Sequence, residues 1–310
     1  MDAADQHRAW LARRRALERG PVSVSPAGAS PKWRKRVSDL VVTLGGLALR
    51  ATPLHAIGRR NALAPRLAEI ELALPRLPGA FDGLRLLQVS DTHLDHLPEL
   101  APIARRLLDG LEVDLLVLTG DVQGRHDAPI ERATGLLAEV LSGVRVRDRR
   151  LAILGNHDPA EMADALVGLG FEVLVNRSIV LERGGDRLHV TGLDDVHYFY
   201  TEAALRALEA RPPERAAFRL ALIHSAELAD RAAAAGCDLY LCGHTHGGQV
   251  CPPGGRPIAT HLARCRSAAK GLWRWDAMTG YTSNGLGVSG PRLRFNCPAE
   301  AVLFTLRRGG

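Results

Sequence analysis

Cysteine, aromatic residues and long apolar runs are all scarce in this chain of 310 residues. The five cysteines have no paired spacing, which argues against a disulfide framework or a zinc ribbon and favours a reducing compartment. Aromatic residues make up 5% of the chain, and no motif for stacking bases is visible, so nucleic acid is not an expected partner. The apolar stretch at 37–49 contains Asp39 and is too short to span a bilayer.

Five short apolar runs each end in polar residues that can bind a metal ion. The runs have the composition of buried strands, and helix-like stretches such as 97–111 and 130–141 lie between them. Strand and helix therefore alternate, which indicates an α/β fold, and ligands in such folds gather outside the carboxyl ends of the strands. The polar residues after the runs are Asp91 and His93, Asp121, Asn156 with His157 and Asp158, His224, and His244 with His246.

The most informative of these segments contains His244 and His246. Residues two apart in an extended segment point to the same side, so both imidazoles can converge on one ligand. Gly243, Gly247 and Gly248 allow the backbone to turn tightly there. We interpret this segment as half of a metal site.

The ligand types indicate which metals the site would take. Carboxylate, amide and imidazole groups without sulfur suit Mn, Fe or Zn, and the set holds too much imidazole for a calcium or magnesium cage. Seven ligands are too many for one tetrahedral ion but suffice for two ions that share a carboxylate. Two ions about 3.5–4 Å apart are usual in hydrolytic phosphoryl chemistry. We therefore predict two divalent transition-metal ions, manganese before iron or zinc.

These residues resemble the five-part signature of the calcineurin-like metallophosphoesterases over about residues 84–250, in both order and spacing. The segments 247–250, 283–289 and 292–300 resemble the YkuE/YaeI branch, which includes membrane-associated bacterial phosphodiesterases. The resemblance implies two packed β-sheets flanked by helices. We expect a catalytic domain at 61–310 and interpret 280–283 and 301–306 as strands of the second sheet.

The resemblance also implies a role for each site residue. Asp91, His93 and His246 would bind one metal ion, and Asp121 would bridge both ions. Asn156, His224 and His244 would bind the second ion. His157 would contact the scissile phosphate or the leaving oxygen, and Asp158 would hold its ring. In one departure, many relatives follow Gly-Asp with two residues and then a further Asp, whereas this chain has Gly124 at that position.

The expected reaction is hydrolysis of a phosphodiester or a pyrophosphate. Two dications would offset the charge of the substrate, and the hypothesis is in-line attack by a metal-bridging hydroxide with His157 as the acid. The branch resemblance and the basic amino end favour a lipid-linked nucleotide such as UDP-2,3-diacylglucosamine, an intermediate of lipid A synthesis. The segment 252–272 is interpreted as either a basic cap over the pocket or a solvated loop. Its basic residues are Arg256, Arg264, Arg266 and Lys270.

Two other functions remain open. A broad-specificity phosphodiesterase or nuclease would degrade cyclic nucleotides or short nucleic acid without lipid. A non-catalytic binding protein on a degenerate phosphoesterase fold would bind no transition metal, although all seven ligands and His157 are present. Asp194, Asp195 and His197 are interpreted as a turn in preference to contacts beside the site.

Residues 1–60 are expected to form a basic extension. Clusters at 13–15 and 32–36 contribute to the net charge of +6, and residues 20–31, rich in Pro, Ser and Gly, are interpreted as a linker. The segment 37–49 fits either a helix on an anionic membrane, with Trp33 at the interface, or a helix packed on the catalytic domain. The expected location is cytoplasmic, with peripheral attachment to the inner face of the membrane as one alternative.

Overall fold

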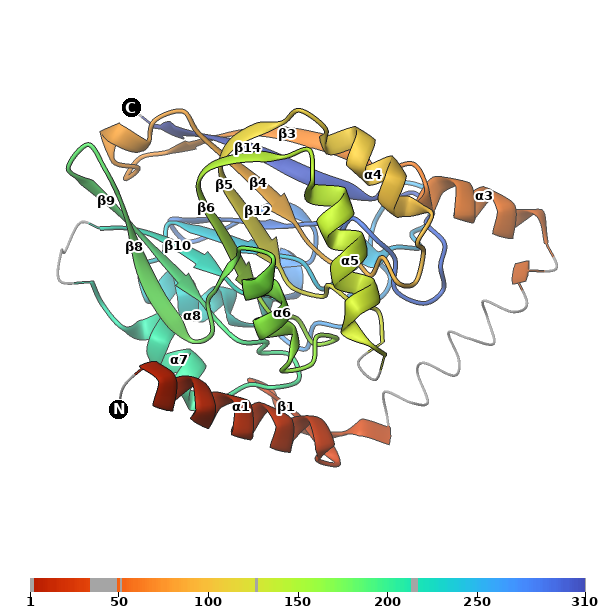
Figure 1. Cartoon of the computed structure of the whole chain (residues 1–310), viewed down its shortest axis with the longest axis horizontal. Coiled ribbons are helices and arrows are strands. Elements are labelled where there is room, and N and C mark those ends of the chain that lie inside the picture. The colour runs from red at the N-terminus through yellow and green to blue at the C-terminus, as the bar shows by residue number, and fades with distance from the viewer. Residues whose placement is uncertain (1–2, 34–48, 51, 126–127, 213–216, 310) are drawn as a thin grey trace.

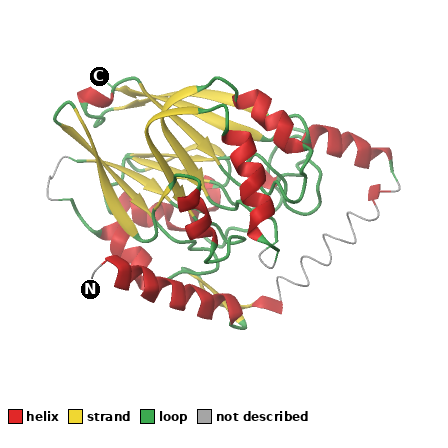
Figure 2. Cartoon of the chain, in the orientation of Figure 1, coloured by secondary structure: helices red, strands yellow, loops and turns green. Residues whose placement is uncertain are grey.

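Two six-stranded β-sheets pack face to face, and helices cover their outer faces (Figure 1, Figure 2). The structure, a computed structural model, describes residues 3–33, 49–50, 52–125, 128–212 and 217–309. This arrangement confirms the predicted α/β fold with two packed sheets flanked by helices.

The first sheet has the strand order β3-β14-β4-β5-β6-β7, and every neighbouring pair except β14 and β4 is parallel. Three helices follow the strands of this sheet along the chain and pack on its outer face. The strands are β3 (Arg66–Leu74), β4 (Leu84–Val89), β5 (Glu112–Thr119), β6 (Arg145–Ile153), β7 (Glu172–Val173) and β14 (Glu300–Arg308). The helices are α4 (Leu100–Leu108), α5 (Ile130–Leu141) and α6 (Met162–Gly168).

The second sheet has the strand order β12-β13-β11-β10-β9-β8, with a parallel centre and antiparallel edges. Its strands are β8 (Arg177–Arg183), β9 (Asp186–Gly192), β10 (Phe218–Leu222), β11 (Leu239–Cys242), β12 (Gly271–Trp275) and β13 (Met278–Thr282). The helices α7 (Glu202–Glu209) and α8 (Ala229–Ala234) pack on its outer face. Short 3₁₀ helices are η1 (Gly79–Phe81), η2 (Ala226–Leu228), η3 (His246–Gly248) and η4 (Arg266–Ala268).

One strand assignment from the sequence is wrong. The strand expected at 280–283 does belong to the second sheet as β13, but the strand expected at 301–306 is β14, which lies in the first sheet between β3 and β4. Its apolar side chains fit either sheet, and pairing with the distant β3 decides its place.

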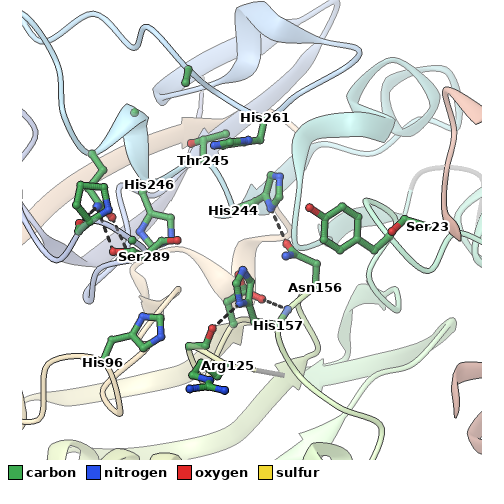
Figure 3. A pocket seen from close by; sticks show the side chains of 18 of the residues that line it. Ser23, His96, Arg125, Asn156, His157, His244, Thr245, His246, His261 and Ser289 are labelled. Carbon is green, nitrogen blue, oxygen red and sulfur yellow. Dashed lines mark hydrogen bonds between the residues drawn. The ribbon is translucent and has the colours of Figure 1, made fainter. Parts of the chain in front are cut away.

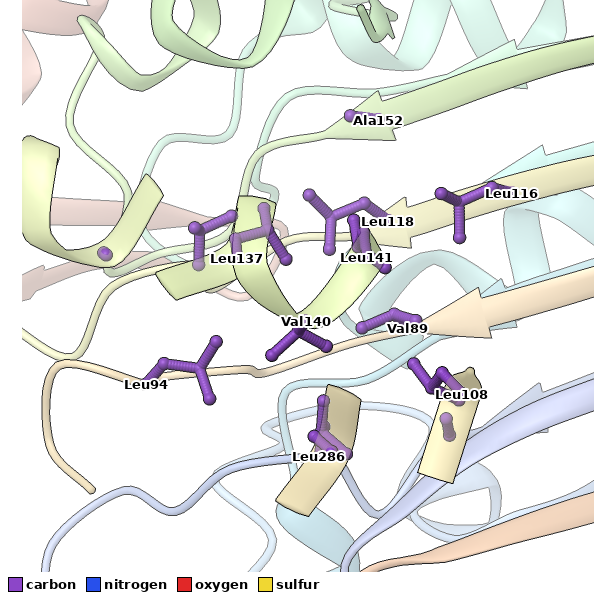
Figure 4. Packing of buried hydrophobic residues seen from close by; sticks show 14 of the residues in the cluster. Val89, Leu94, Leu108, Leu116, Leu118, Leu137, Val140, Leu141, Ala152 and Leu286 are labelled. Atoms are coloured by element: carbon purple, nitrogen blue, oxygen red, sulfur yellow. The ribbon is translucent and has the colours of Figure 1, made fainter. Parts of the chain in front are cut away.

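Alternating side chains of the first sheet fill two separate cores. Leu115 and Val117 of β5 face the second sheet, whereas Leu116 and Leu118 face the helices. On the helix side, Leu137, Val140 and Leu141 of α5 form one apolar stripe against these strands (Figure 4). Each fully buried leucine stabilises the fold by roughly 1.5–3 kcal/mol. The carboxyl end of β5, where Asp121 follows, is therefore held firmly on both faces.

The amino-terminal segment is folded onto the domain. Helix α1 (Ala3–Arg19) leads into a hairpin of β1 (Val22–Ser25) and β2 (Gly28–Pro31), and β1 also bridges Val24 to Phe199. The expectation of a linker at 20–31 is wrong, because backbone bonds to Phe199's neighbours order these residues. Helix α3 (Pro53–Ala62) precedes β3. The expected membrane helix at 37–49 lies outside the described residues except for Leu49. Among the helices that the structure describes, none has the length and apolar content to cross a membrane.

Candidate metal centre and substrate pocket

The carboxyl ends of the central parallel strands of both sheets meet at one edge of the sandwich. Strands β4, β5 and β6 of the first sheet end there, as do β10 and β11 of the second. The loops that follow these five strands carry all seven predicted ligands, namely Asp91, His93, Asp121, Asn156, His224, His244 and His246.

The predicted ligands form two groups whose donor atoms lie within 4.8 Å of one another. The first group is Asp91, His93 and His246, and the second is Asp121, His224 and His244. Asn156 joins the second group, because its Oδ1 lies 2.7 Å from His244 Nδ1. Asp121 Oδ2 lies 3.5 Å from His93 Nε2 and 3.3 Å from His224 Nε2, so this carboxylate is placed between the two groups.

Four buried imidazole nitrogens in these groups have no hydrogen-bond partner. His93 Nδ1 lies 2.7 Å from the carbonyl of Gln123, and His224 Nδ1 lies 2.8 Å from the carbonyl of Thr119. A carbonyl only accepts, so Nδ1 carries the proton in each ring and leaves the Nε2 lone pair for a metal. Nε2 of both rings, Nε2 of His244 and Nδ1 of His246 are the unpartnered atoms. Since an unpartnered buried polar atom is costly, this donor set fits metal ions.

The pKa values of His93, His244, His246 and Asp121 agree with this assignment, whereas His224 and Asp91 would each have to give up a proton to a metal. Burial lowers the pKa of His93, His244 and His246, so these rings are neutral. Burial alone would raise the pKa of Asp121, but the positive charges of His224 and His157 bring it well below its usual range. Burial lowers the pKa of His224 whereas Asp121 raises it, and the net result is about 10. Burial also raises the pKa of Asp91 to about 7.

Five ligands occupy the left-handed backbone region that non-glycine residues rarely adopt. They are Asp91, His93, Asp121, His244 and His246, with φ values of 48°, 36°, 56°, 71° and 51°. Each such residue costs roughly 1–3 kcal/mol, which the surrounding packing must offset. The packing is tight at Gly243, where a Cβ would lie 2.1 Å from Asp91 Oδ2 and 2.0 Å from Ser90 Oγ. Glycine is therefore required at that position.

Asp158 does not hold the ring of His157, so that part of the expected role is wrong. Its carboxylate accepts four backbone N–H bonds, from Asp121, Val122, Gln123 and Gly155 at 2.8–3.3 Å. The ring of His157 is instead placed by the carbonyl of Gly124, 2.6 Å from its Nδ1. The loop turns the Asp158 side chain inward and the His157 side chain toward the pocket, so neighbours in sequence point apart.

A cavity of about 940 Å³ opens beside the two ligand groups. Its wall includes Asp121, Asn156, His157, His244 and His246 of the candidate site. Figure 3 shows His157 between the pair Asn156 and His244 and the pair His96 and Arg125. The hairpin contributes Ser23, Ser30 and Pro31, and Lys32 follows it. The pocket is thus shared between the catalytic loops and the amino-terminal segment.

The segment 252–272 borders the pocket, but not as a basic cap. Ile258, Ala259 and His261 line the cavity. None of its four basic residues lines the cavity. Arg264 pairs with Asp230, and Arg266 and Lys270 donate to the carbonyls of Leu262 and Gly255.

Sequence reasoning missed two buried arginines around the ligands and interpreted the half-buried His197 as part of a turn. Arg294 is fully buried and donates to the carbonyls of Asn284 and Gly287 at 2.6 Å, and these loops pack against Asp91. The ring of His197 lies 4.1 Å from that of His244, so the segment expected as a plain turn supports a ligand. Arg14 of α1 binds the loop that carries Asn156. Arg294 had a signal in the sequence through its place in the segment 292–300, and His197 had one through its place after the apolar run that ends at 193, whereas Arg14 had none.

Comparisons with known proteins agree with this geometry. The sequence profile of the calcineurin-like phosphoesterases matches residues 84–248. The uncharacterized metallophosphoesterase YkuE of Bacillus subtilis is 28% identical over 241 residues, which cover 74% of this chain and 82% of YkuE. Phosphodiesterase YaeI of Escherichia coli is 28% identical over 235 residues, or 72% of this chain and 82% of YaeI. A Danio rerio transmembrane protein with a metallophosphoesterase domain is 28% identical over 309 residues, or 92% of this chain and 66% of that protein. The chain belongs to the calcineurin-like phosphoesterase family and is a metal-dependent phosphoester hydrolase.

Proposed function

We propose that the chain hydrolyses a phosphodiester or pyrophosphate in a lipid-linked nucleotide such as UDP-2,3-diacylglucosamine, a step of lipid A synthesis, and that it uses two manganese ions. The observation that carries the proposal is the cavity of about 940 Å³, whose wall joins ligands of both groups to an amphipathic rim. Ligand sites commonly measure about 300–1,000 Å³, so this one has room for far more than a phosphate group.

Each side chain of the site has a separate role in the proposed reaction. Asp91, His93 and His246 would hold one ion and Asn156, His224 and His244 the other, with Asp121 between them. Bound divalent cations supply positive charge to the phosphate and lower the pKa of water near it. His157 lies in the pocket wall with its ring placed by the carbonyl of Gly124. In this position its other ring nitrogen can give a proton to the departing oxygen.

The pocket rim has the chemistry of a substrate that is anionic at one end and apolar at the other. Arg125 and Lys32 bring positive charge to the wall, and Tyr198 offers an aromatic surface. Val250 and Ile258 also line the cavity, and they are among the exposed large apolar residues, 38% and 79% accessible. A nucleotide diphosphate near the charges and an acyl chain along the apolar rim would use both kinds of surface.

Exposed side chains near the amino end support a membrane-facing role on the cytoplasmic side. Trp33 is 62% exposed and Leu54 and Ile57 of α3 are 49% and 39% exposed, while Arg59 and Arg60 add positive charge to the same helix. Apolar and basic residues together favour an anionic lipid surface. We keep residues 1–60 as an extension and 61–310 as the catalytic domain, since both six-stranded sheets lie within 61–310.

The test is hydrolysis by the manganese-loaded protein of UDP-2,3-diacylglucosamine in detergent and of bis-p-nitrophenyl phosphate, with Asp121→Ala as the control. Release of UMP that depends on Asp121 would support the lipid substrate. Cleavage of only the chromogenic diester would remove the lipid substrate and keep a phosphodiesterase. Cleavage of cyclic nucleotides or short nucleic acid without lipid would favour the broad-specificity alternative. No cleavage with two metals bound would refute the proposal.

A further inference from the structure

A buried arginine that lies outside the matched residues 84–248 contacts a loop of the candidate site. Arg14 lies near the middle of α1, far from the matched residues 84–248, and only 1% of it is exposed. Burying a guanidinium is costly unless its donors are satisfied. Its neighbours on the same helix differ, since Arg13 is exposed and the Arg15 side chain is 43% exposed.

The guanidinium binds the backbone of the loop that carries Asn156 and His157. Arg14 Nη2 donates to the carbonyl of Gly155 at 3.0 Å and to the carbonyl of Asp158 at 2.7 Å. These two carbonyls flank the predicted metal ligand and the predicted acid, so one nitrogen fixes both ends of the segment between them.

The other sides of the guanidinium are also filled. Nη1 pairs with the carboxylate of Asp194, and Nε donates to Glu18 Oε1 at 3.1 Å. The ring of Phe199 lies 3.6 Å from the guanidinium carbon. Glu18 Oε1 also accepts from Ala160 N at 2.9 Å, so α1 holds the same loop at a third backbone point.

Two anchors therefore hold the loop from opposite sides. The Asp158 carboxylate joins it to the backbone after Asp121, and Arg14 joins it to α1. Without the second anchor, the loop could shift away from the ligands of the other strands while the sheets stayed intact.

We propose that Arg14 is a positioning residue for phosphoester hydrolysis, which holds Asn156 and His157 in place through the carbonyls of Gly155 and Asp158. The inference rests on the proposed roles of Asn156 and His157. With Arg14 in this role, helix α1 contributes to the active site and is not only an extension of the catalytic domain. Misplacement of a reacting group by about 1 Å can cost about 10²-fold in rate.

The test compares Arg14→Lys with two controls on α1. A lysine keeps the charge beside Asp194, but one ammonium cannot also reach both carbonyls. Arg15→Lys alters the exposed pair with Glu161, and Trp10→Phe removes the bond from Trp10 Nε1 to Asp194, 2.7 Å long, without touching the loop. The measurements are kcat and KM on bis-p-nitrophenyl phosphate, Mn content and affinity by calorimetry, and Tm.

We expect Arg14→Lys to lower kcat by about 10–100-fold with a change in KM below about threefold, and to weaken one of two Mn-binding steps. Trp10→Phe is expected to lower Tm and leave kcat and Mn binding unchanged. If α1 only stabilised the fold, Trp10→Phe and Arg14→Lys would instead affect kcat and Mn binding alike. Arg14→Lys with at least half the wild-type kcat and normal Mn binding would overturn the inference.

Two further outcomes are informative. A wild-type protein that binds Mn but cleaves neither bis-p-nitrophenyl phosphate nor UDP-2,3-diacylglucosamine would overturn the proposed function instead. If Arg14→Lys does not fold, Glu18→Gln replaces it, because that change weakens the bonds to Ala160 N and Arg14 Nε. A smaller fall in kcat is then expected, and a wild-type kcat would overturn the inference.

Discussion

Replacing Asp158 by asparagine tests whether this residue acts on the backbone or on catalysis. One carboxylate oxygen accepts from the N–H groups of Asp121 and Gly155, at 2.8 and 2.9 Å. The other accepts from Val122 and Gln123, at 2.8 and 3.3 Å. Asparagine has one accepting oxygen, so one pair of N–H groups would face an amide NH₂ and lose its partner.

The expected loss follows from these two bonds. An unsatisfied buried N–H costs about 1–3 kcal/mol, so two cost about 2–6 kcal/mol. Burial, followed by the charge of Asp121, raises the pKa of Asp158 to about 6, so the negative charge is itself unfavourable there. We therefore expect the lower part of the range, about 2–4 kcal/mol, and a fall in Tm on the order of 10 °C.

Thermal unfolding in chelator and in Mn, together with kcat at 15 °C, would check this expectation. Asp164→Asn is the matched control, because the Asp164 side chain is 71% exposed on α6. A large fall in Tm with Asp158→Asn and an unchanged Tm with the control would agree with a backbone role. An unchanged Tm and normal Mn content with a 100-fold fall in kcat would refute the backbone role. That result would support the earlier expectation that Asp158 orients the ring of His157.

His157→Ala is expected to lower kcat by about 10²–10⁴-fold with normal metal content, because His157 lies in the pocket wall with its Nδ1 beside the carbonyl of Gly124 and is not one of the predicted ligands; loss of both metals on elemental analysis would contradict its assigned role. Asp121→Ala is expected to lose metal as well as activity, since this carboxylate lies between both groups; two tightly bound ions in the variant would argue against bridging. The rise in Tm caused by Mn is expected to grow from pH 6 to pH 8. The pKa values of Asp91 and His224 are raised to about 7 and about 10, so both groups hold protons at pH 6 that metal must displace, and fewer remain as the pH rises. A metal effect that shrinks over this range would count against these groups as ligands.

The sequence could predict the ligand set because the fold places the carboxyl ends of its parallel strands at one edge. Each apolar run, such as the one before Asp121, is recognisable by itself, and the polar residue after it is brought to that edge by the topology. The sheet to which β14 belongs was not predictable, because its side chains are apolar wherever it pairs. Pairing with β3 depends on contacts more than 200 residues apart.

The orientation of single side chains was equally beyond the sequence. Arg14 stands between two other arginines, and only the helix turn and the docking of α1 decide which one is buried. The hairpin at 22–31 has few apolar residues, and its order comes from the backbone bridge to Phe199. Asp158 follows His157 directly in the sequence, but the loop turns its carboxylate away from the His157 ring and toward the backbone after Asp121.

The division of each ligand group between the two sheets has a mechanical consequence. Asp91 and His93 follow a strand of the first sheet and His246 a strand of the second, and Asp121 likewise faces His224 across the sandwich. A metal ion in either group would therefore be a cross-link between two layers that pack largely through apolar side chains. It would close a chain loop of on the order of 100 residues or more, much as a disulfide does. A cell short of these metals would then hold a protein that is less durable as well as inactive.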